Sequence, residues 1–482
     1  MFIDDVIAAI STPVGHSGIG IVRLSGRDSI KIADKIFTSL QKRTLKKTPT
    51  HRLVYGHIIN SRKEIIDEVL VSVMKAPHTY TKENIVEINC HGGPVPLRRI
   101  LALVLKNGAR LAEPGEFTRR AFLNKRIDLA QAEAVLDVIN SLTEQSRKTA
   151  VEQLSGGLSK KTESIREGLL SIITIVEAYI DFPEEEIEFP ALKEMKKTAL
   201  SIRKSLRQLI ESSQYGMILR DGLKTAIIGR PNVGKSSLLN ALLEQDRAIV
   251  TEVPGTTRDI IEDYLNIHGL PVKIMDTAGI RKVEDIAEKE GVKRSHKAMK
   301  DADLVLIVLD GSESLHDTDK QLISKSDPKN TLFVINKADL PQKIKSKTIE
   351  VKYSKTHTKE HKESTPPHTP LTTGGRGDFQ IVKISALKGK GIKELKNKIV
   401  EVALQGSPAN AAVTVTNIRH VHVLKRTLKS VDSFIKEIDK KTSPEFLSVE
   451  LREALDAIGE ITGATTSEDI LNKIFTNFCI GK

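Results

Sequence analysis

Five short segments near the middle of the chain combine glycine, lysine, hydroxyl and carboxylate groups in an order that could hold a phosphorylated ligand. The first is Gly229-Arg-Pro-Asn-Val-Gly-Lys-Ser236, which follows an apolar stretch over 225–228 and precedes a helical pattern over 236–243. In this strand–loop–helix order, backbone N–H groups and a helix N-terminus converge on phosphates. We therefore expect Lys235 to reach the terminal phosphates and the Ser236 hydroxyl to bind Mg²⁺.

The other four segments follow at distances that suit a guanine-nucleotide site. They are Gly255-Thr-Thr-Arg-Asp259, Asp276-Thr-Ala-Gly279, Asn336-Lys-Ala-Asp339 and Ser385-Ala-Leu387. Asp276 comes directly after an apolar stretch, where a carboxylate can hold the metal ion through water. The Asp339 carboxylate can accept hydrogen bonds from N1–H and the exocyclic amine of guanine, a donor pair that adenine lacks. The five segments together predict GTP binding, with contacts from Asn232, Val233, Gly234, Lys235, Ser236, Ser237, Thr251, Thr256, Thr257, Asp276, Thr277, Ala278, Gly279, Asn336, Lys337, Asp339, Ser385, Ala386 and Leu387.

The residues expected to drive hydrolysis differ from the commonest arrangement. Many GTPases orient the attacking water with a glutamine after the Asp-x-x-Gly segment and recruit an arginine for transition-state charge. Here Ile280 occupies the glutamine position. The Asn232 side chain, with backbone carbonyls of 251–257, could instead hold a monovalent cation against the phosphates. The alternative is that Asn232 only stabilises its loop. A water-orienting carboxylate could lie within 284–290, but spacing does not select one.

Composition and charge restrict the class of protein. The chain has 482 residues, a net charge of +12 and a pI near 9.3, which favours an anionic partner such as nucleic acid. A solvated basic surface is the alternative. Trp is absent and aromatic residues are few, so backbone and shape recognition is favoured over base stacking. Two cysteines exclude a disulfide framework. With an acidic N-terminus and no membrane-length apolar run, we expect a soluble cytoplasmic protein.

Apolar periodicity predicts a multidomain protein. Residues 1–122 mix strand and helix patterns with Gly-rich turns, which indicates an α+β N-terminal domain. Residues 123–217 and 405–482 show helical periodicity, whereas 218–404 alternate strands and helices. The economical interpretation is one all-α domain split by an inserted α/β, Ras-like GTPase domain; two separate helical domains are the alternative. Residues 343–378 are rich in Lys, Thr, Ser, Pro and His and are predicted to be a disordered basic insertion.

Individual elements of the N-terminal domain can also be expected. Its strands are predicted over 19–24, 69–74 and 85–88, and its helices over 30–40 and 94–107. Cys90 follows one of these strands and is expected in the core.

Several sequence stretches outside the nucleotide segments resemble one known family. They are Gly20-Ile-Val-Arg-Leu-Ser25, Glu87-Ile-Asn-Cys-His-Gly-Gly-Pro94, Pro114-Gly-Glu-Phe-Thr-Arg-Arg-Ala-Phe-Leu-Asn124, residues 178–186 and the ending Phe478-Cys-Ile-Gly-Lys482. Together with the Asn232-containing loop and Gly255–Asp259, they extend over nearly the whole chain. The sequence resembles the MnmE/TrmE family of bacterial tRNA-uridine-modifying GTPases.

The resemblance implies potassium-dependent GTP hydrolysis that is activated when two GTPase domains meet across a homodimer. It assigns K⁺ to Asn232 and the carbonyls of Thr251, Val253 and Thr256, and Mg²⁺ to Ser236 and Thr257. The water-orienting glutamate falls on Glu288. The catalytic set is therefore expected to be Glu288, Lys235 and Asn232.

The resemblance further implies that the N-terminal domain dimerises and binds a formyl-tetrahydrofolate-type folate as one-carbon donor. The matching positions are Arg23, Glu87 and Lys482. At a fourth position the family has a lysine and this chain has Arg126, and the adjacent Lys125 could substitute for that lysine. The expected reaction installs carboxymethylaminomethyl on C5 of the wobble uridine of certain tRNAs, with the FAD-dependent, NADH-using MnmG/GidA protein as partner. A competing hypothesis is a regulatory or ribosome-assembly GTPase switch, which would not need a folate site.

Overall fold

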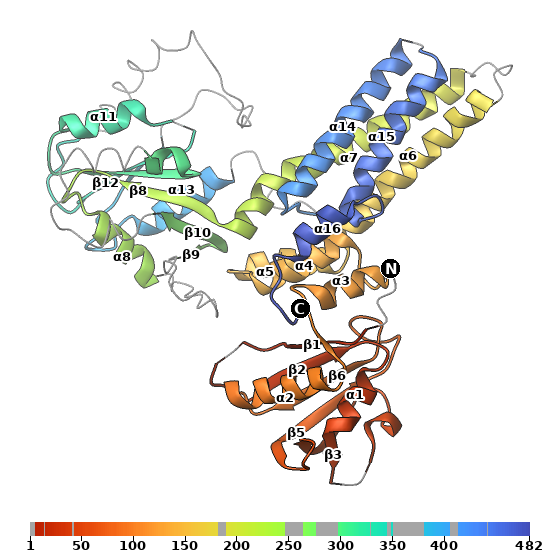
Figure 1. The fold of residues 1–482 in the computed structure, drawn as a ribbon. Helices are drawn as coiled ribbons and strands as arrows, with labels where there is room; N and C mark the ends of the chain where they lie inside the picture. Colours follow the sequence, from red (N-terminus) through yellow and green to blue (C-terminus); the bar gives the residue numbers. More distant parts are fainter. Residues whose placement is uncertain are drawn as a thin grey trace.

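The computed structural model describes residues 5–13, 15–40, 43–181, 189–245, 264–275, 297–327, 329–344, 349, 380–404, 413–440 and 442–482. Figure 1 shows an N-terminal sheet with helices, a bundle of long helices and a second sheet with its own helices. This arrangement confirms the predicted fold class. None of the helices within the described ranges is both long enough and apolar enough to cross a membrane.

The N-terminal domain is built on a seven-stranded sheet of order β3-β4-β5-β6-β2-β1-β7. Helices α1 (Ser29–Ile36) and α2 (Pro94–Lys106) bury their apolar residues against one face of it. Cys90 is buried in this core, as expected, and burial raises the pKa of its thiol to about 11. The strands are β1 (Ile7–Ile10), β2 (Gly20–Ser25), β3 (Phe37–Ser39), β4 (Arg52–Ile59), β5 (Ile65–Met74), β6 (Ile85–Cys90) and β7 (Arg110–Leu111).

The helix predicted over 30–40 is wrong in its second half. Helix α1 ends at Ile36, and Phe37–Ser39 form β3, which pairs antiparallel with β4. The physical reason is the close approach of the two strands at Gly56, where a Cβ atom would lie 2.2 Å from the Thr38 carbonyl oxygen. The helical periodicity of the sequence continues over residues 37–39, but it cannot indicate that these residues pair with another strand in the folded protein.

The helical domain consists of segments from both sides of the GTPase domain. Its helices are α4 (Leu129–Ile139), α5 (Glu144–Leu154), α6 (Gly157–Asp181), α7 (Phe189–Asp221), α14 (Ile418–Asp439), α15 (Pro444–Thr462) and α16 (Glu468–Phe475). One apolar cluster joins Leu169, Leu206, Phe434 and Ile458, all buried. The interpretation as one helical domain is therefore confirmed, and the alternative of two separate domains is wrong.

A buried ionic cluster fixes the start of α14, where the chain returns from the GTPase domain, to α4. The Glu133 carboxylate accepts hydrogen bonds from Asn417 Nδ2 (2.9 Å) and Arg419 Nη2 (2.7 Å), and lies 2.7 Å from His420 Nε2. Burial alone would raise the pKa of Glu133, but the charges and hydrogen bonds of His420 and Arg419 outweigh it and lower this pKa to about 2. Glu133 therefore remains ionised and holds the returning chain.

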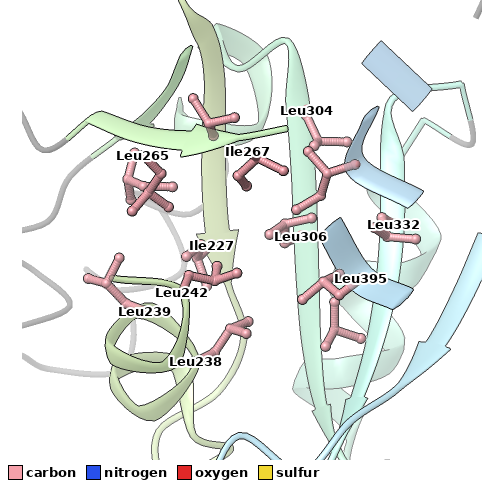
Figure 2. Packing of buried hydrophobic residues seen from close by; sticks show 14 of the residues in the cluster. Ile227, Leu238, Leu239, Leu242, Leu265, Ile267, Leu304, Leu306, Leu332 and Leu395 are labelled. Carbon is pink, nitrogen blue, oxygen red and sulfur yellow. The ribbon is translucent and has the colours of Figure 1, made fainter. Parts of the chain in front are cut away.

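The GTPase domain has a six-stranded sheet of order β13-β12-β11-β8-β10-β9, in which only β9 is antiparallel to its neighbour. Figure 2 shows Leu238, Leu239 and Leu242 of α8 packed toward Ile227 and the strands around it. The elements are β8 (Leu223–Ile228), α8 (Lys235–Gln245), β9 (Tyr264–Ile267), β10 (Leu270–Met275), β11 (Leu304–Asp310), α11 (Asp317–Lys325), β12 (Thr331–Asn336), β13 (Gln380–Lys383) and α13 (Ile392–Ala403).

The start of the predicted basic insertion needs a correction. The insertion was expected to begin at Lys343, but Ile344 and Ile349 are buried in an apolar cluster with Ile335 and Leu322. These two isoleucines therefore belong to the core of the GTPase domain. Isolated apolar side chains in a polar segment can still pack beside a sheet, and composition alone does not reveal this. Residues 345–348 and 350–378 lie outside the described residues.

Candidate nucleotide-binding site

The phosphate loop connects β8 to α8, as the sequence predicts. Parallel strands place their carboxyl ends at one edge of the sheet, so the loop lies beside the ends of β11 and β12. Gly234 has a φ of 96°, and a Cβ atom there would lie 2.2 Å from Asn336 Nδ2. Only glycine fits that position. Asn232 also has a positive φ, 63°, and its side chain is exposed at the surface of the loop.

The Lys235 ammonium lies within this loop. Its Nζ donates hydrogen bonds to the carbonyl oxygens of Gly229 (2.8 Å) and Arg230 (2.9 Å). Burial lowers the pKa of Lys235. Lys235 begins helix α8, and the next two residues lie in its first turn, with Ser236 half-buried and Ser237 exposed. The backbone N–H groups of this first helical turn and the lysine charge together suit a phosphate chain.

Asn336 joins three of the five predicted segments. It ends β12 and is almost fully buried. Its Nδ2 donates to the Val233 carbonyl of the phosphate loop (2.9 Å), and its Oδ1 accepts from the Ala386 N–H (3.0 Å). The side chain therefore fixes the position of the base segment relative to the phosphate segment, a role that sequence alone does not assign.

Asp310 is a partner of the predicted base segment that sequence reasoning missed. It lies at the end of β11, and its Oδ2 is 2.5 Å from the Nζ of Lys337, which has a φ of 61°. Its Oδ1 accepts from the N–H (2.9 Å) and hydroxyl (2.6 Å) of Ser312. Burial raises the pKa of Asp310, but the bonds from Lys337 and Ser312 outweigh this and lower it. An aspartate directly after an apolar strand was the available signal, as it was for Asp276.

Asp339 is held as a carboxylate, which is the form that accepts hydrogen bonds from guanine. A hydrogen bond from the Ser385 side chain is the main cause of its lowered pKa, and the charge of Lys388 contributes. Lys388 Nζ lies 4.0 Å from Asp339 Oδ2. The next residue of the last segment, Ala386, is buried, whereas the Leu387 side chain is 86% exposed. The structure thus brings together the first, fourth and fifth predicted segments.

The predicted residues of the second and third segments cannot be placed. Thr251, Val253, Thr256, Thr257, Asp276, Thr277, Ala278, Gly279 and Glu288 lie outside the described residues. Of the groups expected to bind metal ions, the structure therefore places Asn232 and Ser236.

A second cluster of predicted residues lies on the N-terminal sheet. Arg23 and Glu87 are opposite each other on β2 and β6, and Arg23 Nε is 2.8 Å from Glu87 Oε1. Arg23 Nη1 also donates to the carbonyl of Gly481 (3.1 Å). The Lys482 carbonyl accepts from the Phe117 N–H (3.2 Å). The C-terminal tail, residues 479–482, is therefore docked beside the Arg23–Glu87 pair, and Figure 1 shows the C-terminus above the N-terminal sheet.

Arg126 belongs to the edge of the same cluster. Its guanidinium lies 4.7 Å from the centre of the Tyr80 ring. Tyr80 packs against an apolar group that includes Phe117, and the Arg23 guanidinium lies 5.7 Å from the Phe117 ring. The carbonyl of the adjacent Lys125 accepts from Lys82 Nζ (2.8 Å). Arg126 is therefore linked to the Arg23 region only through the packing of Tyr80 against the buried Phe117, and no contact joins Arg126 directly to Arg23 among the described residues.

Comparison with known families agrees with both clusters. Residues 6–126 match the family described as the GTP-binding protein TrmE N-terminus, and residues 129–479 match the MnmE helical domain. The chain belongs to the MnmE/TrmE family. The tRNA modification GTPase MnmE of Alkaliphilus oremlandii is 47% identical over 484 residues, which covers 100% of both chains. The protein of the same description from Thermoanaerobacter pseudethanolicus is 47% identical and covers 99% of both chains.

Membership of the MnmE/TrmE family identifies the chain as a GTPase. A third relative, the tRNA modification GTPase MnmE of Clostridioides difficile, is 44% identical over the full length of both chains. The described half of the nucleotide site has the parts that such an enzyme needs: a glycine-dependent phosphate loop, a lysine within it and a carboxylate for the base.

Proposed function

We propose that this protein is a potassium-dependent GTP hydrolase that installs carboxymethylaminomethyl at C5 of the wobble uridine of certain tRNAs. In this proposal it acts as a homodimer with an FAD-dependent partner of the MnmG/GidA kind and uses a tetrahydrofolate one-carbon donor. The observation that carries the proposal is the Arg23–Glu87 pair beside the docked C-terminal tail, on the same chain as the nucleotide site. A GTPase that acts only as a switch has no use for this second cluster.

The residues of the second cluster fit a folate. The Glu87 carboxylate can accept hydrogen bonds from the N–H groups of an aminopyrimidinone ring, and the half-buried Lys482 offers an ammonium that suits a carboxylated ligand. The half-buried Tyr80, which packs against the buried Phe117, provides apolar surface for a flat ring. When bound, the folate would supply a one-carbon unit, and the residues of this chain would bind and orient it.

The open face of the N-terminal sheet supports the homodimer. Helices cover the other face, whereas Leu53, Tyr55 and Leu70 are exposed on this one, with Tyr55 and Leu70 directly opposite each other. Arg23 and Glu87 point to the same face, in the cross-strand row that continues through Ser72 to Leu53. Because large apolar side chains in one patch commonly mark an interface, a second copy seated here would also cover the folate site.

The nucleotide site supports a cation-assisted hydrolysis. The Ser236 hydroxyl at the start of α8 would ligate Mg²⁺ with Thr257. Asn232 would direct its side-chain oxygen at K⁺, together with the carbonyls of Thr251, Val253 and Thr256. A cation held at this position would stabilise negative charge that develops on the phosphates, where other GTPases use an arginine.

The tRNA assignment can be tested by mass spectrometry of nucleosides. In cells that lack this protein, we expect tRNA to lose the carboxymethylaminomethyl-modified uridine, and the intact gene should restore it. A gene that encodes Arg23→Ala should fail to restore the modification while the purified variant still hydrolyses GTP. An unchanged nucleoside profile in the deletion strain would instead favour a ribosome-assembly switch.

The role of Asn232 can be tested through its dependence on K⁺. Because φ is 63° at this position, Asn232→Gly removes the side-chain oxygen without straining the backbone, whereas alanine would add strain. We expect the glycine variant to lose most of the stimulation of turnover by K⁺ over Na⁺, with GTP affinity near that of the wild type. Asn232→Asp keeps an oxygen ligand and is the matched control, which should retain stimulation. If K⁺ stimulated the glycine variant as fully as the wild type, Asn232 would not be a ligand of the cation.

A further inference from the structure

The four long helices of the bundle differ strongly in charge. Helices α7 and α14 pack side by side and carry 12 basic and 6 acidic residues. Helices α6 and α15 also pack side by side but carry 4 basic and 9 acidic residues. Figure 1 shows these four helices as one elongated bundle. The bundle therefore has one positive and one negative pair of helices.

Exposed basic residues recur at helical spacing on both α7 and α14. Helical spacing places Lys425, Lys429 and Lys436 on one face of α14, and Lys204 and Arg207 on one face of α7. All five side chains are exposed, and none forms an ion pair with another residue in the described part of the chain. We refer to these five residues as the α7/α14 basic face.

Ion pairs along the seam between the two helices keep this face positive. Arg203 Nη1 lies 3.6 Å from Asp432 Oδ1, and Lys196 pairs with Asp439. These pairs show that the helices run antiparallel, with Arg207 at about the level of Lys425 and Lys429 along the bundle. Asp432 and Asp439 are thereby neutralised by Arg203 and Lys196, which do not belong to the basic face. The five side chains of the basic face remain available for a ligand.

We propose that the α7/α14 basic face binds the sugar–phosphate backbone of the tRNA substrate. The inference rests on the proposed function, which supplies the class of polyanion. From Lys425 to Lys436 the helix rises about 16 Å, a length over which a nucleic acid strand presents several phosphates. The basic face includes no aromatic side chain that could stack on bases. It is therefore suited to position an RNA by its backbone, whereas selection of the uridine takes place elsewhere.

Charge reversal on α14 tests this surface. In the full-length protein, the double variant Lys425→Glu/Lys429→Glu is compared with Lys31→Glu/Lys35→Glu, which changes two exposed lysines at the same spacing on α1 of the N-terminal domain. Both variants change the net charge equally. Binding of a fluorescently labelled tRNA transcript is measured by anisotropy between about 50 and 200 mM KCl.

We expect the α14 variant to lose at least about tenfold in tRNA affinity, and its slope of log affinity against log salt to fall in magnitude by about 1.5, which corresponds to two phosphate contacts. The α1 variant should bind tRNA as the wild type does, and GTP turnover should be unchanged in both. Equal affinities of the two variants would overturn the inference, as would a wild type that binds no tRNA. A change in sedimentation without a change in tRNA binding would overturn it in favour of a protein contact. Nucleoside analysis of the deletion strain is independent of these outcomes and tests the proposed function by itself.

Discussion

Asp339→Asn is expected to lower the affinity for GTP by at least about 10²-fold and to create affinity for xanthosine triphosphate. The wild-type carboxylate offers acceptors only, which complement the N1–H and amine donors of guanine. An asparagine amide offers one acceptor and one donor. It therefore leaves the guanine amine without a partner but complements xanthine, which has N1–H beside a carbonyl oxygen. Competition between the two unlabelled nucleotides for a fluorescent analogue measures the change.

The local structure provides a control for this exchange of specificity. Asp339 interacts with Ser385 and lies near Lys388, so its replacement also changes the surrounding loop. Lys388→Ala removes the neighbouring charge without changing the acceptor pair, and it should preserve the preference for guanine. An Asp339→Asn protein that binds neither nucleotide would indicate that the loop has collapsed, and the base-contact role would then lack support.

Predictions from the sequence succeeded where a pattern is local. Apolar periodicity was sufficient to locate β6 and α2 and the long helices of the bundle, because burial of one face fixes the type of each element. The single helical domain could also be inferred, since both outer segments have an apolar stripe that needs a partner. Strand β3 was missed because its residues become a strand only through pairing with β4 at Gly56.

The nucleotide site shows the same division between local and tertiary information. Glycine, lysine and aspartate at fixed spacing predict the phosphate loop and the base segment, because each motif contains its own backbone geometry. The link from Asn336 to both Val233 and Ala386 depends on how strands and loops meet at the sheet edge. The partnership of Asp310 with Lys337 likewise joins two strands. Residue types alone do not specify such contacts between segments.

The cluster that we propose for folate could be predicted only from the family resemblance, not from a sequence pattern. Arg23 in isolation is an ordinary charged residue on a strand, and nothing in the sequence indicates that the tail reaches it. The structure brings the Gly481 carbonyl to 3.1 Å from Arg23 Nη1, across most of the length of the chain. Gly481 has a φ of 98°, and a Cβ atom there would lie 2.5 Å from the Ile10 carbonyl oxygen. The tail therefore docks in a way that requires glycine at this position.

Glu288→Ala is expected to slow GTP hydrolysis by about 10²-fold or more while GTP still binds. Because Ile280 cannot orient the attacking water, another group must do so, and the family resemblance assigns this role to Glu288. Alanine removes the acceptor that would align the water with the γ-phosphate, but it leaves the phosphate loop and Asp339 unchanged. Single-turnover hydrolysis in KCl separates this chemical effect from nucleotide binding, which is measured with a fluorescent GTP analogue.

Glu290 offers a matched control for Glu288, because it is a glutamate only two residues further along the chain. Glu290→Ala should hydrolyse GTP at close to the wild-type rate. The opposite result, a normal rate for Glu288→Ala and a slow one for Glu290→Ala, would transfer the water-orienting role to Glu290. Normal rates for both variants would show that neither carboxylate orients the water. Hydrolysis would then depend on another acidic residue within 284–290 or on a group from the second GTPase domain of the proposed dimer.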